Sequence, residues 1–238
     1  MNLKVNNLFE IFEPFLDIIF PERCVLCGRY LEGYICSKCR EKLKFGENYC
    51  LLCGAPLTFP EKVCYNCKKE NNILIEGFEF LGYYKGIWED LISKFKFEHK
   101  PYIAKTFAKM GRERILSRNW DIDLITYVPM WKDKEKKRGY NQSYILAKYL
   151  SRELQLSVVS TLKQERPILE QKNLGRAERL ENVKNAFKLM ENVDIEGKNI
   201  LIVDDVYTTG ATIRECAKEL RNGRCNKIYV FVICRAIN

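Results

Sequence analysis

The stretch Asn199-Ile-Leu-Ile-Val-Asp-Asp-Val-Tyr-Thr-Thr-Gly-Ala-Thr212 sets the architecture of this 238-residue chain. Its apolar run over residues 200–203 suits a parallel strand that is covered on both faces. A helix should follow, because apolar residues recur there at the spacing i, i+3, i+4 and i+7 before a stop at Gly223: Ile213, Cys216, Ala217 and Leu220. The stretch therefore predicts an α/β fold in which helices flank a parallel sheet.

The residues between this strand and this helix predict a sugar-phosphate site. Asp204 and Asp205 stand at the carboxyl end of the strand, where sheets of this kind bind their ligands. Adjacent carboxylates can accept hydrogen bonds from the vicinal hydroxyls of a ribose or hold a magnesium ion. The loop over residues 207–212 offers backbone N–H groups and three threonine hydroxyls around a glycine, at the positive end of a helix. A phosphate group would bind in that loop.

The pattern over residues 200–212 resembles the phosphoribosyl pyrophosphate (PRPP) signature of type I phosphoribosyltransferases. An ordinary strand, turn and helix is the simpler alternative, but it requires neither a double aspartate nor a Thr-Thr-Gly-x-Thr loop. The resemblance implies that the catalytic residues Asp204 and Asp205 contact the ribose hydroxyls and that the loop wraps the 5′-phosphate. The PRPP-binding residues that it implies are Val206, Tyr207, Thr208, Thr209, Gly210, Ala211 and Thr212.

Composition predicts a globular chain with one sizeable core and a small additional module, since 47% of the residues are hydrophobic and 30% are charged. We expect a short N-terminal helix over residues 1–22, a ribbon module over residues 23–70 and a phosphoribosyltransferase-like domain over residues 71–238. Acidic residues interrupt the apolar pattern of the first segment, which argues against a signal peptide or a membrane span: Glu10, Glu13 and Asp17. A helix on the membrane surface is the alternative for that segment.

Eight of the eleven cysteines form four Cys-x-x-Cys pairs within residues 24–67. Tetrahedral zinc takes four thiolates, so this spacing predicts two structural zinc sites. Our assignment is sequential, with one site formed by Cys24, Cys27, Cys36 and Cys39 and the other by Cys50, Cys53, Cys64 and Cys67. An interleaved pairing of the same cysteines stays open, and disulfides are the other alternative. Bound thiolates would also offset part of the formal charge of +9, so the basic signal for nucleic acid is modest.

Two further segments are expected at the same site. A basic loop over residues 131–143 follows an expected strand at residues 123–129, so it should lie at the same sheet edge as Asp204. Such a charge run is usually only solvated. Its position favours a grip on pyrophosphate by Lys132 and Arg138. A lid is expected over residues 166–187.

These segments sharpen the resemblance to the ComF family, in which a cysteine-rich ribbon module precedes a phosphoribosyltransferase-like domain. The basic loop carries the Arg-Gly-x-Asn-Gln pattern through Arg138, Gly139, Asn141 and Gln142. The lid stretch matches through Arg166, Gln171, Leu174, Arg179, Asn182, Val183 and Phe187. Among these, the resemblance assigns the lid role to Arg166, Gln171 and Arg179. Pro167-Ile-Leu169 replaces the polar start expected of this lid, which leaves its contacts with an acceptor open.

The resemblance implies a role in DNA uptake during natural transformation, together with a ComFA-type helicase. It also implies Mg²⁺-dependent transfer of phosphoribosyl from PRPP to an unknown acceptor. The alternative is a protein without catalysis that senses PRPP or binds single-stranded DNA as an adaptor, because fold alone does not settle activity. We expect a cytoplasmic protein, or one held at the inner face of the membrane by its partners.

Overall fold

The computed structural model describes residues 23–30, 34–58, 61–70, 74–98, 100–168 and 176–237. The helix expected over residues 1–22 lies outside these described residues. The chain divides into two compact units, Met1–Leu43 and Lys44–Asn238. Within the described ranges, every helix is too short or too polar to cross a membrane.

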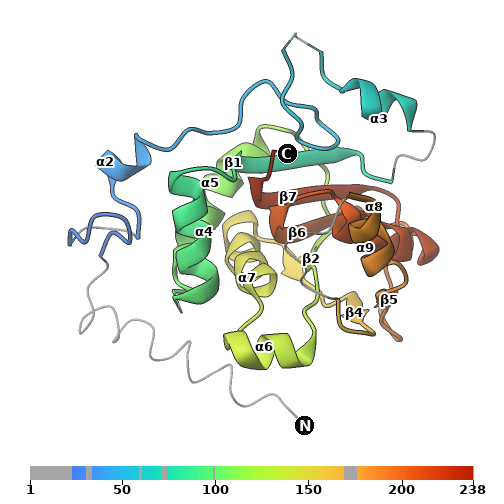
Figure 1. The fold of residues 1–238 in the computed structure, drawn as a ribbon. Coiled ribbons are helices and arrows are strands. Elements are labelled where there is room, and N and C mark those ends of the chain that lie inside the picture. The colour runs from blue at the N-terminus through green and yellow to red at the C-terminus, as the bar shows by residue number, and fades with distance from the viewer. Residues whose placement is uncertain are drawn as a thin grey trace. The chain divides into compact units, whose positions relative to one another are not determined.

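A five-stranded parallel sheet forms the centre of the Lys44–Asn238 unit, with the strand order β1-β7-β6-β2-β3. Figure 1 shows the first four of these strands side by side in that order. Their bounds are β1 (Gly77–Tyr83), β7 (Ile228–Arg235), β6 (Ile200–Tyr207), β2 (Leu124–Tyr127) and β3 (Ser157–Val158). The strand β6 pairs on both sides, which explains why residues 200–203 are apolar without interruption and fully buried. The α/β parallel sheet expected from sequence is therefore confirmed.

Helices cover both faces of this sheet. On one face α9 (Ala211–Asn222) buries Ile213 and Leu220 in a cluster with Ile200 and Ile202 of β6. The other face carries a second layer, in which three helices pack: α4 (Ile87–Phe97), α5 (Ile103–Leu116) and α7 (Gln142–Leu154). The close approach of α5 uses a glycine, because the ring of Phe231 lies where a side chain at residue 111 would stand. Alternate residues of each strand thus face opposite helix layers.

A small antiparallel pair extends beyond the main sheet. It consists of β4 (Leu162–Gln164) and β5 (Phe187–Leu189), and α8 (Arg176–Val183) precedes β5 and packs against α9. Phe187 and Leu162 are buried in the same cluster as the α9 face of the sheet. The stretch expected to act as a lid therefore starts and ends on this pair.

The expectation of a basic loop over residues 131–143 is wrong for its central part, because α6 (Lys132–Arg138) is a helix. Its charges explain the difference. Asp133 and Glu135 lie in the first turn, and the basic residues lie in the last turn, so both ends complement the helix dipole. Gly139 then ends the helix with a φ of 89°, a conformation that glycine adopts without strain. The segment presents its positive charge from a helix.

The second cysteine segment, which carries Cys50, Cys53, Cys64 and Cys67, hydrogen-bonds to the outer edge of the sheet. Gly46 donates from its N–H to the carbonyl of Leu81 (2.9 Å), and Phe78 donates to the carbonyl of Leu51 (2.7 Å). These bonds satisfy the outer edge of β1, which would otherwise expose unpaired backbone groups. The division of the chain into a ribbon module and a phosphoribosyltransferase-like domain at residues 70 and 71 stays a prediction from sequence.

A buried carboxylate strengthens the contact between the second cysteine segment and the sheet. Glu79 of β1 is 1% exposed, and its carboxylate accepts hydrogen bonds from Tyr49 Oη (2.5 Å), Arg114 Nε (2.7 Å) and Arg118 Nε (2.6 Å). Tyr49 also packs edge-on against Phe80, with ring centroids 4.7 Å apart. One carboxylate thereby joins the second cysteine segment, the edge strand and α5.

Candidate functional site

A cleft of about 730 Å³ opens at the carboxyl end of β6. Its lining residues come from the strands β4, β5 and β6, from the helices α4, α6, α7 and α9, and from the segments that follow β2 and β4. They include five residues that the sequence singles out, namely Arg138, Asn141, Asp204, Asp205 and Thr212. The cleft thus brings together parts of the chain that lie up to 116 residues apart in the numbering, from Lys96 to Thr212. The lining combines the carboxylates of Asp204 and Asp205 with three basic side chains of α6: Lys134, Lys137 and Arg138.

Asp204 is half-buried and held by two donors. Its Oδ1 accepts a hydrogen bond from Ser143 Oγ (2.7 Å) and another from the backbone N–H of Asp205 (2.9 Å). Desolvation and the negative charge of Asp205 raise the pKa of Asp204, the two donors and Lys96 oppose the rise, and the net result is a pKa of about 7. The carboxyl group is therefore poised to change its protonation state when a ligand with hydroxyl donors arrives.

Asn141 positions the serine that holds Asp204. Its side-chain oxygen accepts from the N–H groups of Ser143 (2.9 Å) and Tyr144 (3.3 Å), which caps the start of α7. Its side-chain amide donates to the carbonyl of Val128 (3.0 Å), just beyond the end of β2. One buried asparagine therefore fixes the helix start against the neighbouring strand.

Lys96 is a site residue that sequence reasoning missed. It comes from α4, and its Nζ lies 2.9 Å from Asp205 Oδ1 with the lysine side chain 20% exposed. The signal in the sequence is weak: Lys96 follows the buried Phe95 and stands four residues after the buried Ile92, so it flanks the apolar face of the helix. Its ammonium group offsets one of the two adjacent carboxylates.

The loop between β6 and α9 has a geometry that requires glycine. Gly210 has a φ of 80°, and a Cβ atom there would lie 2.1 Å from Tyr207 Oη. Tyr207 is buried beneath the loop and packs edge-on against Phe78, with ring centroids 4.7 Å apart. The helix starts directly afterwards at Ala211, so its first N–H groups lack acceptors within the helix. The loop can therefore offer several N–H donors to one anion.

The basic side of the cleft is formed by α6. Arg138 donates from Nη1 to Gln142 Oε1 (2.9 Å), and its guanidinium lies over the ring of Phe97 at 5.2 Å from the centroid. Lys134 and Lys137 line the cleft beside Arg138. Lys132, the first residue of α6, is exposed and is not among the described residues that line the cleft.

The predicted lid is described only in part. Arg166 donates to the carbonyl of Lys184 (2.7 Å) and ties the start of this segment to its end, whereas the neighbouring Pro167 and Ile168 line the cleft. Gln171 and the side chain of Arg179 lie outside the described part of the chain.

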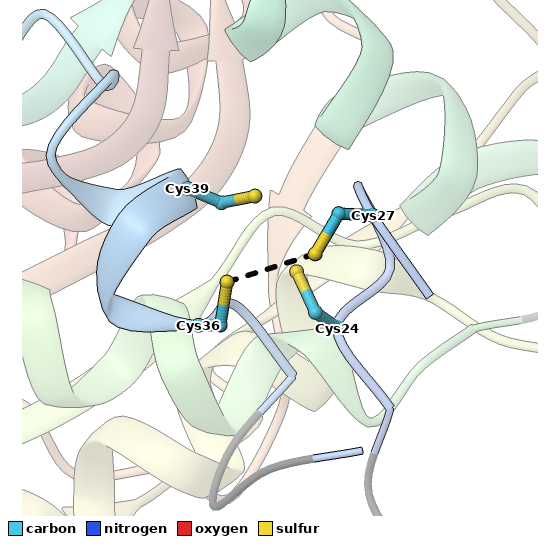
Figure 2. A group of neighbouring side chains, drawn as sticks. All are labelled: Cys24, Cys27, Cys36 and Cys39. Atoms are coloured by element: carbon cyan, nitrogen blue, oxygen red, sulfur yellow. Dashed lines mark hydrogen bonds between the residues drawn. The ribbon is translucent and has the colours of Figure 1, made fainter. Parts of the chain in front are cut away.

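The eight clustered cysteines form two groups of four. In each group the four Sγ atoms lie within 4.8 Å of one another, and the groups follow the sequential pairing: Cys24, Cys27, Cys36 and Cys39, then Cys50, Cys53, Cys64 and Cys67. Figure 2 shows the first group, with its four side chains converging. The structure thus contradicts the interleaved pairing.

The geometry of both groups fits zinc. The Sγ atoms of Cys27 and Cys36 are 3.7 Å apart, as are those of Cys53 and Cys64. Tetrahedral zinc with bonds of about 2.3 Å to sulfur separates its ligands by about 3.8 Å. Burial disfavours a thiolate at Cys24, but backbone N–H donors outweigh it and lower the pKa of this thiol to about 6. Within the same group the pKa of Cys39 is raised to about 12 by burial and by its neighbouring thiols, so the proton is most easily lost from Cys24.

Two known protein families match this chain, one over the cysteine pairs and one over the α/β part. Residues 15–68 match the family described as "Double zinc ribbon domain", and residues 137–237 match the family described as "Phosphoribosyl transferase domain". The first match contains all eight clustered cysteines, and the second contains α7, β6, the glycine loop and α9.

Three relatives are similar over most of the chain. The protein named "Competence protein F" from Haemophilus influenzae is 31% identical over 227 residues, which cover 91% of this chain and 98% of that protein. The "DNA utilization protein YhgH" of Escherichia coli is 30% identical over 226 residues, with the same two coverages. "Competence protein ComFC" of Bacillus subtilis is 27% identical over 217 residues, covering 85% of this chain and 84% of that protein.

Proposed function

This chain belongs to the competence protein F (ComF) family, and from that membership and the cleft at the end of β6 we propose that it binds PRPP with Mg²⁺ and transfers the phosphoribosyl group. The observation that carries the proposal is the meeting of three chemistries in one cleft. Asp204 and Asp205 offer acceptors for hydroxyls, the loop around Gly210, which reaches the cleft at Thr212, offers donors for a phosphate, and α6 offers positive charge for a pyrophosphate.

The ribose of PRPP would meet the two aspartates. Its 2′- and 3′-hydroxyls donate to carboxylate oxygens, and its 5′-phosphate accepts from the N–H groups and threonine hydroxyls of residues 207–212. The pyrophosphate then points toward the basic side of the cleft, where Lys134, Lys137 and Arg138 stand. Lys132 contributes positive charge from the same helix without lining the cleft.

Magnesium would join this site together with PRPP. The oxygen donors of Asp204 and Asp205 are of the type that Mg²⁺ prefers, and the metal usually keeps several waters and contacts substrate phosphates. When bound, Mg²⁺ supplies positive charge that offsets the charge of the departing pyrophosphate.

The chemistry is a displacement at the anomeric carbon of the ribose. The bond from this carbon to pyrophosphate breaks, a bond to the acceptor forms, and positive charge develops on the sugar ring between the two events. Positioned charge is therefore more useful than a dedicated base. The aspartates orient the ring, the cations of α6 receive the leaving group, and the apolar Pro167 and Ile168 exclude water from the side of the cleft that they line.

Lys96 stabilises the adjacent carboxylates of Asp204 and Asp205 while the site is empty. Two adjacent carboxylates repel each other, and the ammonium group at 2.9 Å from Asp205 reduces that repulsion. A ligand that donates two hydroxyls to the pair adds to this compensation, so Lys96 favours the ionised form to which ribose binds.

We infer a biological role in DNA uptake from the names of the relatives, two of which are competence proteins and one a DNA utilization protein. In this role the protein acts in the cytoplasm or at the inner face of the membrane, with a ComFA-type helicase as partner. The second candidate function lacks catalysis. The chain would then either sense PRPP or bind single-stranded DNA as an adaptor. The exposed basic residues of α6 favour that alternative, because they suit phosphate groups of either ligand.

Mass spectrometry distinguishes the two functions. The protein is incubated with PRPP, Mg²⁺ and a pool of nucleobases, amines and single-stranded DNA, and released pyrophosphate is measured together with any product that gains a phosphoribosyl group. Transfer in the wild type that is absent from an Asp204→Asn/Asp205→Asn variant supports the enzyme. PRPP binding without a product in any pool supports the sensor, and competition between PRPP and DNA at constant ionic strength supports the adaptor.

A further inference from the structure

Arg235 joins the second cysteine group to the loop at the phosphate end of the cleft. It is the last residue of β7, and its Nε donates to the carbonyl of Cys53 (2.9 Å). Its Nη1 donates to the carbonyls of Thr208 (2.6 Å) and Tyr207 (3.3 Å). The guanidinium also lies over the ring of Tyr207, 4.9 Å from its centroid. One side chain therefore holds two backbone segments that are more than 150 residues apart in the sequence.

A cavity beside the loop leaves the hydrogen bonds of Arg235 as the main contacts that hold the loop at this place. About 360 Å³ of space lies between the second cysteine segment and the loop, with Cys64 and Cys67 lining it from the segment and Thr208 and Thr209 from the loop. Broad side-chain packing therefore does not fix the loop at this place. Arg235 lines the same cavity, as do the ion-paired Arg214 and Glu70.

The planarity of the peptide bond carries the effect of Arg235 into the loop. The carbonyl of Thr208 and the N–H of Thr209 belong to one rigid trans peptide group, in which oxygen and hydrogen point in opposite directions. A bond that holds the Thr208 carbonyl toward Arg235 therefore directs the Thr209 N–H away from it. The Tyr207 carbonyl fixes the N–H of Thr208 in the same way. These N–H groups are two of the donors assigned to the 5′-phosphate.

We propose that Arg235 is a positioning residue that makes PRPP binding depend on metal in the second cysteine group and not on metal in the first. This inference rests on the proposed function. A metal ion bound by Cys50, Cys53, Cys64 and Cys67 fixes the turn whose Cys53 carbonyl receives Arg235. Without the metal this acceptor moves, and the guanidinium no longer holds the Thr208 carbonyl in place.

Arg235 acts through the loop and not by attracting the phosphate. Its donors point at backbone carbonyls, so a variant without the guanidinium loses the order of the loop but no phosphate contact. The salt dependence of PRPP affinity separates the two roles, because removal of a direct phosphate contact lowers that dependence. Lysine is a poor replacement, since a single ammonium group cannot hold both carbonyls in the fixed fork of a guanidinium.

The test uses four variants of the full chain: Arg235→Met, Arg235→Lys, Cys53→Ser and, as the matched control in the first group, Cys27→Ser. Amide hydrogen exchange of residues 207–212 is measured without PRPP, and binding of PRPP with Mg²⁺ is measured by calorimetry at two salt concentrations. Zinc content and far-UV circular dichroism report metal loss and folding.

We expect Arg235→Met to exchange these amides faster and to bind PRPP about tenfold more weakly, with unchanged salt dependence. Arg235→Lys should recover only part of the affinity. Cys53→Ser should lose about one zinc ion and behave like Arg235→Met, whereas Cys27→Ser should also lose about one zinc ion but keep slow exchange and full affinity.

Wild-type exchange and affinity in Arg235→Met would overturn the inference, and so would an equal loss in Cys27→Ser. If Cys53→Ser does not fold, the arginine variants decide alone. If the wild type does not bind PRPP, the proposed function fails, while the exchange measurements still decide whether Arg235 and the second cysteine group order the loop.

Discussion

Replacement of Glu79 by glutamine should cost the Lys44–Asn238 unit about 3 kcal/mol of its free energy of unfolding. The carboxylate is 1% exposed and receives three side-chain hydrogen bonds, two of them from guanidinium groups. Loss of one member of a buried ionic group generally costs about 3–5 kcal/mol, because the remaining charges stay buried without compensation. Here Arg114 and Arg118 are 23% and 29% exposed, so water screens them in part and the lower end of that range applies.

Urea unfolding followed by circular dichroism at pH 7 measures this loss. Glu98→Gln is the matched control, since Glu98 also pairs with two cations but is 43% exposed, and the control should lose much less stability than Glu79→Gln. Amides of residues 46–51 should exchange faster in Glu79→Gln than in the control, because the glutamine amide lacks the negative charge and has only one acceptor oxygen for the three donors that Glu79 holds. Equal stability of the two variants would refute the role given to the buried carboxylate.

Three further predictions concern the loop at Gly210, the carboxyl group of Asp204 and the zinc content. Gly210→Ala should destabilise the protein by about 1–3 kcal/mol and weaken PRPP binding, since its new Cβ meets Tyr207 Oη. Gly197→Ala, which has a φ of 69° but open space around it, should cost only about 1 kcal/mol and leave binding intact, and denaturation with calorimetry checks both. Because the pKa of Asp204 is raised to about 7, the protonated form stabilises the empty fold, and thermal stability should fall as pH rises from about 4 to 7. Asp204→Asn should lack that part of the pH dependence. If its stability has the same pH profile as that of the wild type, the raised pKa of Asp204 is not the cause. Elemental analysis of freshly reduced protein should give about two zinc ions per chain, and a value near zero would end the zinc assignment.

Local pattern predicts much of this fold. The run over residues 200–203 is apolar because β6 lies between two strands, and the helix that follows keeps its apolar residues on one face. The spacing of the cysteine pairs predicts two four-cysteine groups, but only the positions of the Sγ atoms decide between the sequential and the interleaved pairing. In such cases the physical cause lies within a few residues of the feature.

Tertiary contacts account for what the sequence did not predict. The partner of Asp205 is Lys96, which comes from a helix more than 100 residues earlier and has no distinctive spacing. The part played by Arg235 depends on the backbone of Cys53, and a carbonyl acceptor leaves no trace in the residue type. Residues 132–138 were expected as a loop because a charge run gives no apolar periodicity, although their charge order suits a short exposed helix.

Calorimetric titration of PRPP with Mg²⁺ into the wild type and into Asp204→Asn/Asp205→Asn tests the central claim most directly. The double variant should fold, because its replacements remove the repulsion between two adjacent carboxylates. The account predicts one PRPP site in the wild type and at least a hundredfold weaker binding in the folded variant, equivalent to about 2.7 kcal/mol. Full PRPP affinity in the folded double variant would contradict the assignment of this cleft.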